Sequence, residues 1–103
     1  MSTPSPPGRL AGRRVVVTGA SRGIGAGIAE RAASEGARLA LVARTLDTHP
    51  TLPGSLNETA ERCRALGADV TTIVADLTDE HDRSRVVPEA AAALDGPVEV
   101  LVN

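Results

Sequence analysis

The feature that most constrains this chain is a glycine-rich segment that joins a β-branched run to a run of small residues. Residues 13–18 end in three valines and a threonine, which indicates a short buried strand. Gly19 ends that run. Apolar residues then recur at every fourth position from Ile24, which predicts a helix over residues 23–36. The segment therefore predicts a strand, a tight turn and a helix in direct succession.

The rest of the chain repeats this alternation of strands and helices. Further strands are expected at residues 38–43, 69–75 and 98–102, and further helices at residues 55–67 and 78–94. Strands joined by helical crossovers and short loops predict a parallel sheet with right-handed connections. The expected fold class is therefore α/β, in the order β-α-β-α-β-α-β.

Local signals mark how the later helices begin and end. Ser55 and Glu58 have the spacing of a capping box, and Ala60, Cys63 and Leu66 are expected on the apolar face that follows. Thr78 is the expected N-cap of the third helix. Proline removes a helical hydrogen bond, so Pro88 is expected to kink or split that helix.

The length of 103 residues suits one small domain. Residues 1–10 are rich in Ser and Pro and are expected to be a flexible tail, with the domain occupying residues 11–103. The last predicted strand has no helix after it to cover it. We therefore expect the chain to be the first part of something longer.

Absent residue types exclude several functions. The chain has no Phe, Tyr or Trp, and its 11 basic residues are all Arg. It can supply neither a Tyr acid nor a Lys base, and it cannot form a P-loop, which needs Lys. Base stacking on aromatic side chains is excluded, and a net charge of −2 argues against nucleic acid as a partner.

The other compositional signals are negative too. One cysteine and two separated histidines predict neither an internal disulfide nor a metal site. The longest aliphatic run, residues 39–43, is far too short to span a membrane, and the first ten residues lack the apolar core of a secretory signal. The expected location is the cytoplasm.

The glycine-rich segment has its own chemistry. Gly19, Gly23 and Gly25 follow the spacing Gly-x3-Gly-x-Gly between strand and helix. Glycines permit a tight turn there and let backbone N–H groups approach a pyrophosphate at the helix N-terminus. Ile24 is expected to pack beneath this loop. A glycine-rich turn that binds nothing remains the alternative.

Three motifs together resemble the short-chain dehydrogenase/reductase family. They are residues 18–25, Asp76-Leu77 after the third strand and Leu101-Val102-Asn103 at the fourth. The resemblance spans residues 12–103. It implies a Rossmann-type three-layer sandwich with strand order 3-2-1-4 and an NAD(P) cofactor. The loop at residues 49–54 resembles an insertion in a subgroup of hydroxysteroid-dehydrogenase-like proteins.

The end of the second strand bears on the choice of cofactor. Dinucleotide folds that prefer NAD place Asp or Glu there, whereas this chain has Ala43-Arg44. Arg44 and Arg22 can pair with a 2′-phosphate and Ser21 can add a hydroxyl, so NADP is predicted and NAD is disfavoured. Arginines that are simply solvated are the alternative. The missing carboxylate also argues against an S-adenosylmethionine methyltransferase.

The resemblance assigns roles to further residues. It implies that Asp76 accepts a hydrogen bond from the adenine amino group, that the Leu77 backbone contacts the ring, and that Asn103 lies beside the adenosine ribose. An Asp76 that only terminates its strand is the alternative. The predicted cofactor-binding residues are Gly19, Ser21, Arg22, Gly23, Ile24, Gly25, Arg44, Asp76, Leu77 and Asn103.

The catalytic residues of the resembled family are a Tyr, a Lys four residues later and a Ser. This sequence has no Tyr and no Lys, so no catalytic residue is assigned and the chain alone is expected to be inactive. Three hypotheses follow: the dinucleotide-binding half of an NADP-preferring oxidoreductase acting on a carbonyl or alcohol, a non-catalytic nucleotide- or partner-binding fragment, or an unstable product. The expected partner is a dinucleotide, and the full-length parent is expected to be a homo-oligomer.

Overall fold

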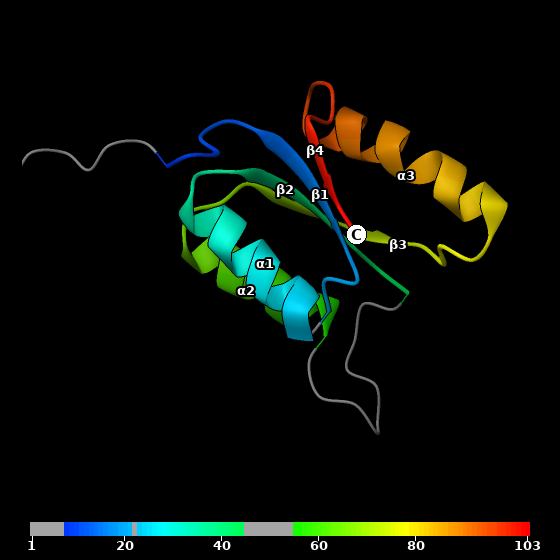
Figure 1. The fold of residues 1–103 in the computed structure, drawn as a ribbon, viewed down its shortest axis with the longest axis horizontal. Coiled ribbons are helices and arrows are strands. Elements are labelled where there is room, and N and C mark those ends of the chain that lie inside the picture. Colours follow the sequence, from blue (N-terminus) through cyan, green and yellow to red (C-terminus); the bar gives the residue numbers. More distant parts are fainter. Residues whose placement is uncertain (1–7, 22, 45–54) are drawn as a thin grey trace, which may run out of the picture.

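A parallel sheet with helices on both faces forms the core of the computed structural model (Figure 1), which describes residues 8–21, 23–44 and 55–103. The strands are β1 (Arg14–Thr18), β2 (Arg38–Ala43), β3 (Val70–Val74) and β4 (Val100–Val102), and the helices are α1 (Gly23–Ser34), α2 (Leu56–Ala65) and α3 (Glu80–Ala93). Their order in the sheet is β3-β2-β1-β4. The α/β class, the Rossmann-type layering and the 3-2-1-4 order are confirmed.

The two central strands are apolar on both faces because helices cover both faces of the sheet. Val15 and Val17 of β1 pack in one core with α1 and α2, whereas Val16 packs in the other core with α3. In β2, Leu39 and Leu41 belong to the first core in the same alternating way. This explains why both strands read as unbroken aliphatic runs.

The helix layers follow from the strand order. α1 and α2 lie side by side on one face and α3 lies on the other (Figure 1). Successive right-handed crossovers from β1 to β2 and on to β3 place α1 and α2 on the same face. The connection from β3 returns past β1 to reach β4, so its helix lies on the opposite face.

The element boundaries differ slightly from the sequence predictions. α1 ends at Ser34, and β4 is limited to Val100–Val102 rather than starting at residue 98. Cys63 is buried as expected, but Leu66 is 53% exposed and does not extend the apolar face of α2. Leu66 is the C-cap of α2, where the backbone departs from helical geometry and turns the side chain away.

The predicted N-cap of α3 was wrong, and the helix is not split at Pro88. Its N-cap is Asp79, whose carboxylate accepts hydrogen bonds from the backbone N–H groups of His81 and Asp82. Thr78 lies one residue before this cap, and its hydroxyl is oriented toward Asp76, to which it donates. Pro88 lies inside an uninterrupted helix. It removes one backbone donor, but the buried side chains on either side of it, Val86 and Ala90, hold the helix against the sheet.

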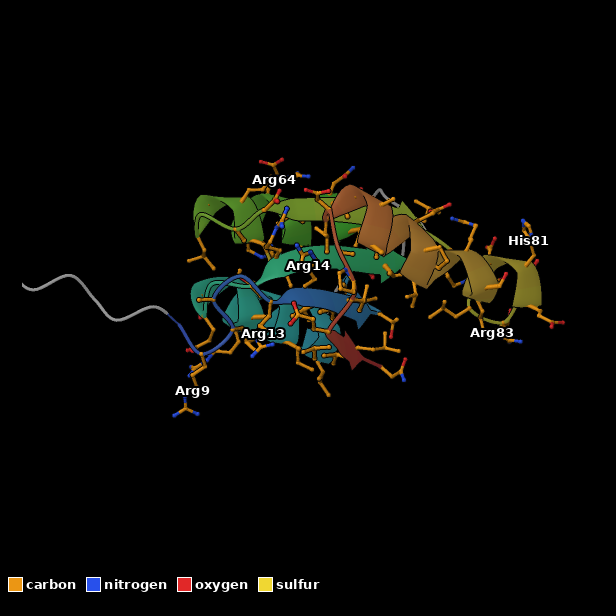
Figure 2. All side chains as sticks on the ribbon, turned by 90° about the horizontal axis from the view of Figure 1, so that it is seen from above. Arg9, Arg13, Arg14, Arg64, His81 and Arg83 are labelled. Carbon is orange, nitrogen blue, oxygen red and sulfur yellow. The ribbon has the colours of Figure 1, made fainter. Side chains whose placement is uncertain are left out.

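Arg14 ties β1 to the far end of α3. Its Nε donates to the Leu94 carbonyl and its Nη2 to the Asp95 carbonyl, each at 2.9 Å. These carbonyls lie at the helix C-terminus, where backbone acceptors lack partners within the helix. By contrast, the exposed Arg9 and Arg83 lie at the outside of the molecule in Figure 2.

Candidate functional site

The carboxyl ends of the parallel strands gather the predicted site residues at one edge of the sheet. Thr18 is paired with Val42, and the Ala75 N–H extends the pairing of β3 with β2 by donating to the Ala43 carbonyl at 2.9 Å. The residues that follow these strands therefore emerge next to one another. In sheets of this type, ligands bind outside the carboxyl ends where the strand order reverses, which here is beside β1.

The glycine loop after β1 depends on its glycines. Gly19 and Gly23 have φ of 62° and 60°, and a Cβ built on either would meet no atom of the described residues within 4 Å beyond its chain neighbours. Backbone at these two positions is therefore open to a close-approaching group. A Cβ on Gly25 would collide with the Gly19 carbonyl, so the third glycine lets α1 pack directly against the loop.

α1 begins directly at this loop, and the N–H groups of its first turn have no acceptor within the helix. No acidic residue lies in the first turn of α1 to neutralise the positive end of the helix dipole. An open glycine backbone next to an uncompensated helix N-terminus is the geometry that binds phosphate groups. Ser21 lies in this loop and is partly buried.

A residue missed by the sequence analysis fastens the glycine loop to α2. Thr59 is fully buried, and its hydroxyl lies 3.4 Å from the Ser21 carbonyl and 3.2 Å from the Ser55 carbonyl. The only available signal was a Thr on the apolar face of the predicted helix. That pattern does not reveal which carbonyl its hydroxyl reaches.

The expectation that Ile24 packs beneath the glycine loop was wrong. Ile24 is 83% exposed, because the face of α1 turned to the sheet carries small residues, including the buried Ala26 and Ala29. Its side chain lines a shallow apolar hollow beside β1 and β4. The other residues around this hollow are Leu10, Val15, Gly27, Ile28, Arg31, Ala32 and Val102.

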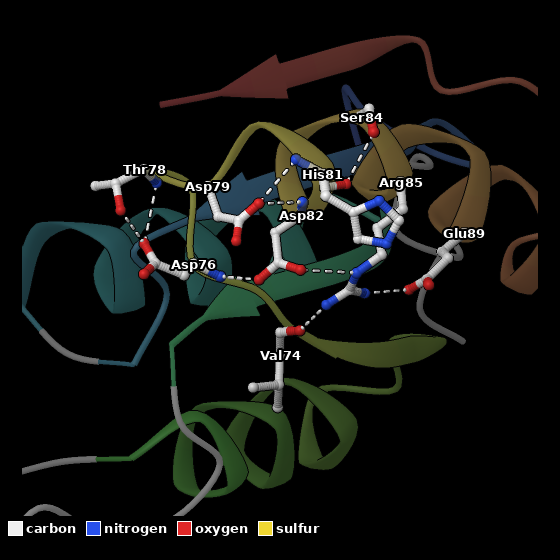
Figure 3. Close-up of polar contacts among 9 residues, drawn as sticks. All are labelled: Val74, Asp76, Thr78, Asp79, His81, Asp82, Ser84, Arg85 and Glu89. Atoms are coloured by element: carbon white, nitrogen blue, oxygen red, sulfur yellow. Dashed lines mark hydrogen bonds and ion pairs between the residues drawn. The ribbon is translucent and has the colours of Figure 1, made fainter.

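Arg44 and Asp76 lie at the ends of the neighbouring strands β2 and β3. The Thr78 hydroxyl and backbone N–H donate to Oδ1 of Asp76 at 2.6 and 3.0 Å (Figure 3). These two hydrogen bonds, together with the nearby Arg44 guanidinium, hold the pKa of the Asp76 carboxyl below its usual range. Asp76 therefore carries a charged acceptor at the edge where the exposed Arg44 carries a donor.

The remaining predicted residues have less distinctive surroundings. Asn103 is exposed and directly follows β4, whose Val102 carbonyl accepts a hydrogen bond of 3.2 Å from the Thr18 hydroxyl. Leu77 is partly buried against the core on the α3 side. Arg22 and the loop at residues 49–54 lie outside the residues that the structure describes.

Other kinds of site find no support in the described part of the chain. Within residues 8–21, 23–44 and 55–103, His, Cys, Asp and Glu side chains form no group able to hold a metal ion. His81 is exposed on the first turn of α3 (Figure 2). None of the helices in these same ranges is both long and apolar enough to cross a membrane. Burial, and after it the charge of Glu30, raises the pKa of the Cys63 thiol.

This edge of the sheet defines a dinucleotide-binding type of α/β protein, and comparison with known proteins specifies the family. The family model described as short chain dehydrogenase matches residues 13–103. The chain belongs to the short-chain dehydrogenase family. It is 42% identical over 96 residues to hydroxysteroid dehydrogenase-like protein 2 of Bos taurus, an alignment that covers 93% of this chain and 23% of that protein. The chain thus spans about a quarter of the length of the curated relatives it matches.

Solved structures show the same fold. A short chain dehydrogenase from Mycobacterium thermoresistibile superposes with a TM-score of 0.83 at 34% identity, over 90% of this chain and 33% of that one. A short chain dehydrogenase from Burkholderia cenocepacia in complex with NADP gives 0.77 at 36% identity, over 92% and 36%. Carveol dehydrogenase from Mycobacterium avium in complex with NAD also gives 0.77, at 27% identity over 91% and 35%. Similar structures therefore hold either nicotinamide dinucleotide.

Proposed function

We propose that this chain is the NADP-binding part of a short-chain oxidoreductase that transfers hydride between the dinucleotide and a carbonyl or alcohol substrate. The observation that carries the proposal is the composition of one sheet edge. An open glycine loop at the N-terminus of α1 lies beside a strand that is followed by Arg44 rather than by a carboxylate. A pyrophosphate suits the first feature and a 2′-phosphate suits the second.

The residues of this edge fit a dinucleotide in chemistry and in space. Gly19 and Gly23 would bring backbone N–H groups to the pyrophosphate, because no side chain of the described residues lies over them. Arg44 would pair with the 2′-phosphate, joined by Arg22 and Ser21. Asp76 would accept from the adenine amino group, Leu77 would contact the ring through its backbone, and Asn103 would lie beside the ribose.

The bound nicotinamide would supply the hydride chemistry, and this chain would bind and orient the dinucleotide. The sequence holds no Tyr and no Lys, so the proton-transfer pair of the family cannot come from these residues. We propose that residues outside this chain supply that pair and the substrate pocket. The length of the relatives supports this, because the alignment covers 23% of the Bos taurus protein.

Replacement of Arg44 by Asp tests the choice of cofactor. Arg44→Asp is expected to lower the preference of the purified protein for NADPH over NADH by about 10- to 100-fold, the worth of one charge-assisted hydrogen bond. The added carboxylate would also repel the 2′-phosphate. Calorimetric titration with each dinucleotide gives the two dissociation constants and hence their ratio.

Arg31→Asp is the matched control. It makes the same change of charge in the last turn of α1, at the opposite edge of the sheet, and should leave the ratio unchanged. If the ratio of the NADPH and NADH dissociation constants were unaltered in Arg44→Asp, Arg44 would not bind the 2′-phosphate. A folded protein that binds neither dinucleotide would refute cofactor binding and favour a partner-binding role.

A further inference from the structure

The Asp76 carboxylate is held in one orientation before any ligand is considered. Oδ1 of Asp76 accepts both hydrogen bonds from Thr78, whereas none of the described residues donates to Oδ2. One oxygen thus orients the group, and the other remains an acceptor for an outside donor. The direction in which Oδ2 faces then depends on the backbone of Asp76.

That backbone lies beyond the last hydrogen bond of the sheet. The pairing of β3 with β2 ends at the Ala75 N–H, so the Asp76 N–H has no strand partner. A side chain from α3 takes the place of the missing strand. Oδ2 of Asp82 accepts the Asp76 N–H at 2.7 Å (Figure 3). The same hydrogen bond is the main reason that the pKa of Asp82 is lowered.

Arg85 holds Asp82 in place. Its Nε donates to Oδ1 of Asp82 at 3.2 Å and its Nη1 to Glu89 at 2.9 Å. Its Nη2 donates to the Val74 carbonyl, the last carbonyl of β3, at 2.6 Å. Side chains of α3 therefore form hydrogen bonds with the backbone at Val74 and at Asp76, on either side of the point where β3 ends (Figure 3).

From this geometry we propose that Asp82 is a positioning residue for adenine recognition. Asp82 fixes the Asp76 backbone so that the Asp76 carboxylate meets the exocyclic amino group of the base. Arg85 holds the Asp82 side chain in the required orientation. The inference rests on the proposed function, because it assumes that Asp76 reads the adenine. Sequence spacing alone does not reveal it, because Asp82 lies in a first helical turn where any acidic residue is favoured.

The test compares NADPH with its hypoxanthine analogue, in which a carbonyl replaces the amino group. The dissociation constant of the hypoxanthine analogue divided by that of NADPH measures recognition of the amino group. Partial unfolding weakens the binding of both ligands equally and leaves this ratio unchanged. Wild type is expected to prefer adenine by about tenfold, and Asp76→Ala should bring the ratio near one. Asp82→Asn should lower the ratio about fivefold, because one amide oxygen cannot serve both the Asp76 N–H and Arg85.

Three further variants sharpen the test. Glu80→Gln removes the same charge from the same exposed first turn and should leave the ratio unchanged. The Asp76→Ala/Asp82→Asn double variant should show no loss beyond that of Asp76→Ala, because both act through one carboxylate. Arg85→Lys keeps the charge but loses the planar donor set, and should shift the ratio in the same direction as Asp82→Asn.

A second measurement needs no ligand. The Asp76 amide should exchange with solvent at least about tenfold faster in Asp82→Asn than in wild type, because its acceptor among the described residues is weakened. An unchanged ratio in Asp82→Asn, with the ratio lost in Asp76→Ala, would overturn the positioning role and leave the proposed function standing. A wild-type protein without adenine preference would overturn the role of Asp76, and the positioning role with it.

Discussion

At the scale of single residues, α1 offers two glycines with opposite surroundings. A Cβ at Gly25 collides with the Gly19 carbonyl, whereas a Cβ at Gly27 meets nothing within 4 Å. Gly25→Ala is therefore expected to lower the free energy of unfolding by about 1–3 kcal/mol and to displace the glycine loop. Chemical denaturation followed by circular dichroism measures the first effect, and loss of NADPH binding reports the second.

Gly27→Ala is the control for that substitution. It adds the same methyl group to the same helix, where Ala is a better helix former, and should raise stability by about 0.5–1 kcal/mol. Equal effects of the two substitutions would mean that helix propensity, rather than contact with the loop, decides the outcome.

The sequence could predict site residues that follow strand ends, but not those that hold them. Gly19, Arg44 and Asp76 were placed correctly at one edge because the carboxyl ends of parallel strands meet there. Thr59 and Asp82 were missed. Each forms a hydrogen bond with a backbone group outside its own helix, and such contacts depend on packing between elements.

At the scale of secondary-structure elements, α2 depends on its N-cap. The Ser55 side chain is buried and accepts a hydrogen bond of 3.0 Å from the Glu58 N–H. Ser55→Ala should lower the free energy of unfolding by about 1 kcal/mol, because it leaves that donor unsatisfied. Thermal and urea unfolding both measure the change.

Ser84→Ala provides the comparison in the interior of α3. Ser84 is exposed, and its hydroxyl bonds back to the His81 carbonyl within its own helix. Loss of such a bond is offset by the higher helix propensity of Ala, so stability should change by less than about 0.5 kcal/mol. A Ser55→Ala effect no larger than this would show that the cap contributes little.

The helices were predicted well and their ends less well, for a physical reason. Apolar periodicity comes from contact with the sheet and is visible along the chain. The choice between Thr78 and Asp79 as N-cap depends on the residue at which the helix starts and on side-chain orientation, and the Thr78 hydroxyl is oriented toward Asp76. Pro88 was expected to disrupt α3, but a propensity estimate omits the packing that keeps the helix on the sheet.

At the scale of the whole molecule, ionised carboxylates couple the fold to pH. The pKa values of Asp76, Asp82 and Glu99 are all lowered, by hydrogen bonds from Thr78, from the Asp76 N–H and from Arg13 respectively. A lowered pKa in the folded state means that the unfolded chain binds protons first as the pH falls. The stability that these groups contribute is therefore full at neutral pH and is lost progressively as the pH falls below about 5.

Urea unfolding at a series of pH values from 6 to 3 tests this coupling. The unfolding midpoint should be flat down to about pH 5 and then fall, and the fall should be smaller in Glu99→Gln, which cannot be protonated at that position. A midpoint that rose on acidification would contradict the lowered pKa values.

The overall architecture was the most predictable level. Two aliphatic strands buried on both faces, joined by helices, require a parallel sheet covered on both sides, and the family resemblance supplied the strand order. The exposure of large apolar side chains was not predictable. Ile24 and Leu101 are 83% and 52% exposed, and hydrophobicity alone assigns such residues to a core.

The burial of Cys63 in α2 provides a way to measure local opening of the fold. The sequence has one cysteine and no aromatic residue, so thiol chemistry offers a signal where intrinsic fluorescence offers none. The side chain is fully buried and its raised pKa keeps it protonated, so a thiol reagent reacts only while α2 is detached from the sheet. The labelling rate of this single thiol therefore measures how often the α2 layer opens, and a dinucleotide bound at the adjoining glycine loop would slow it.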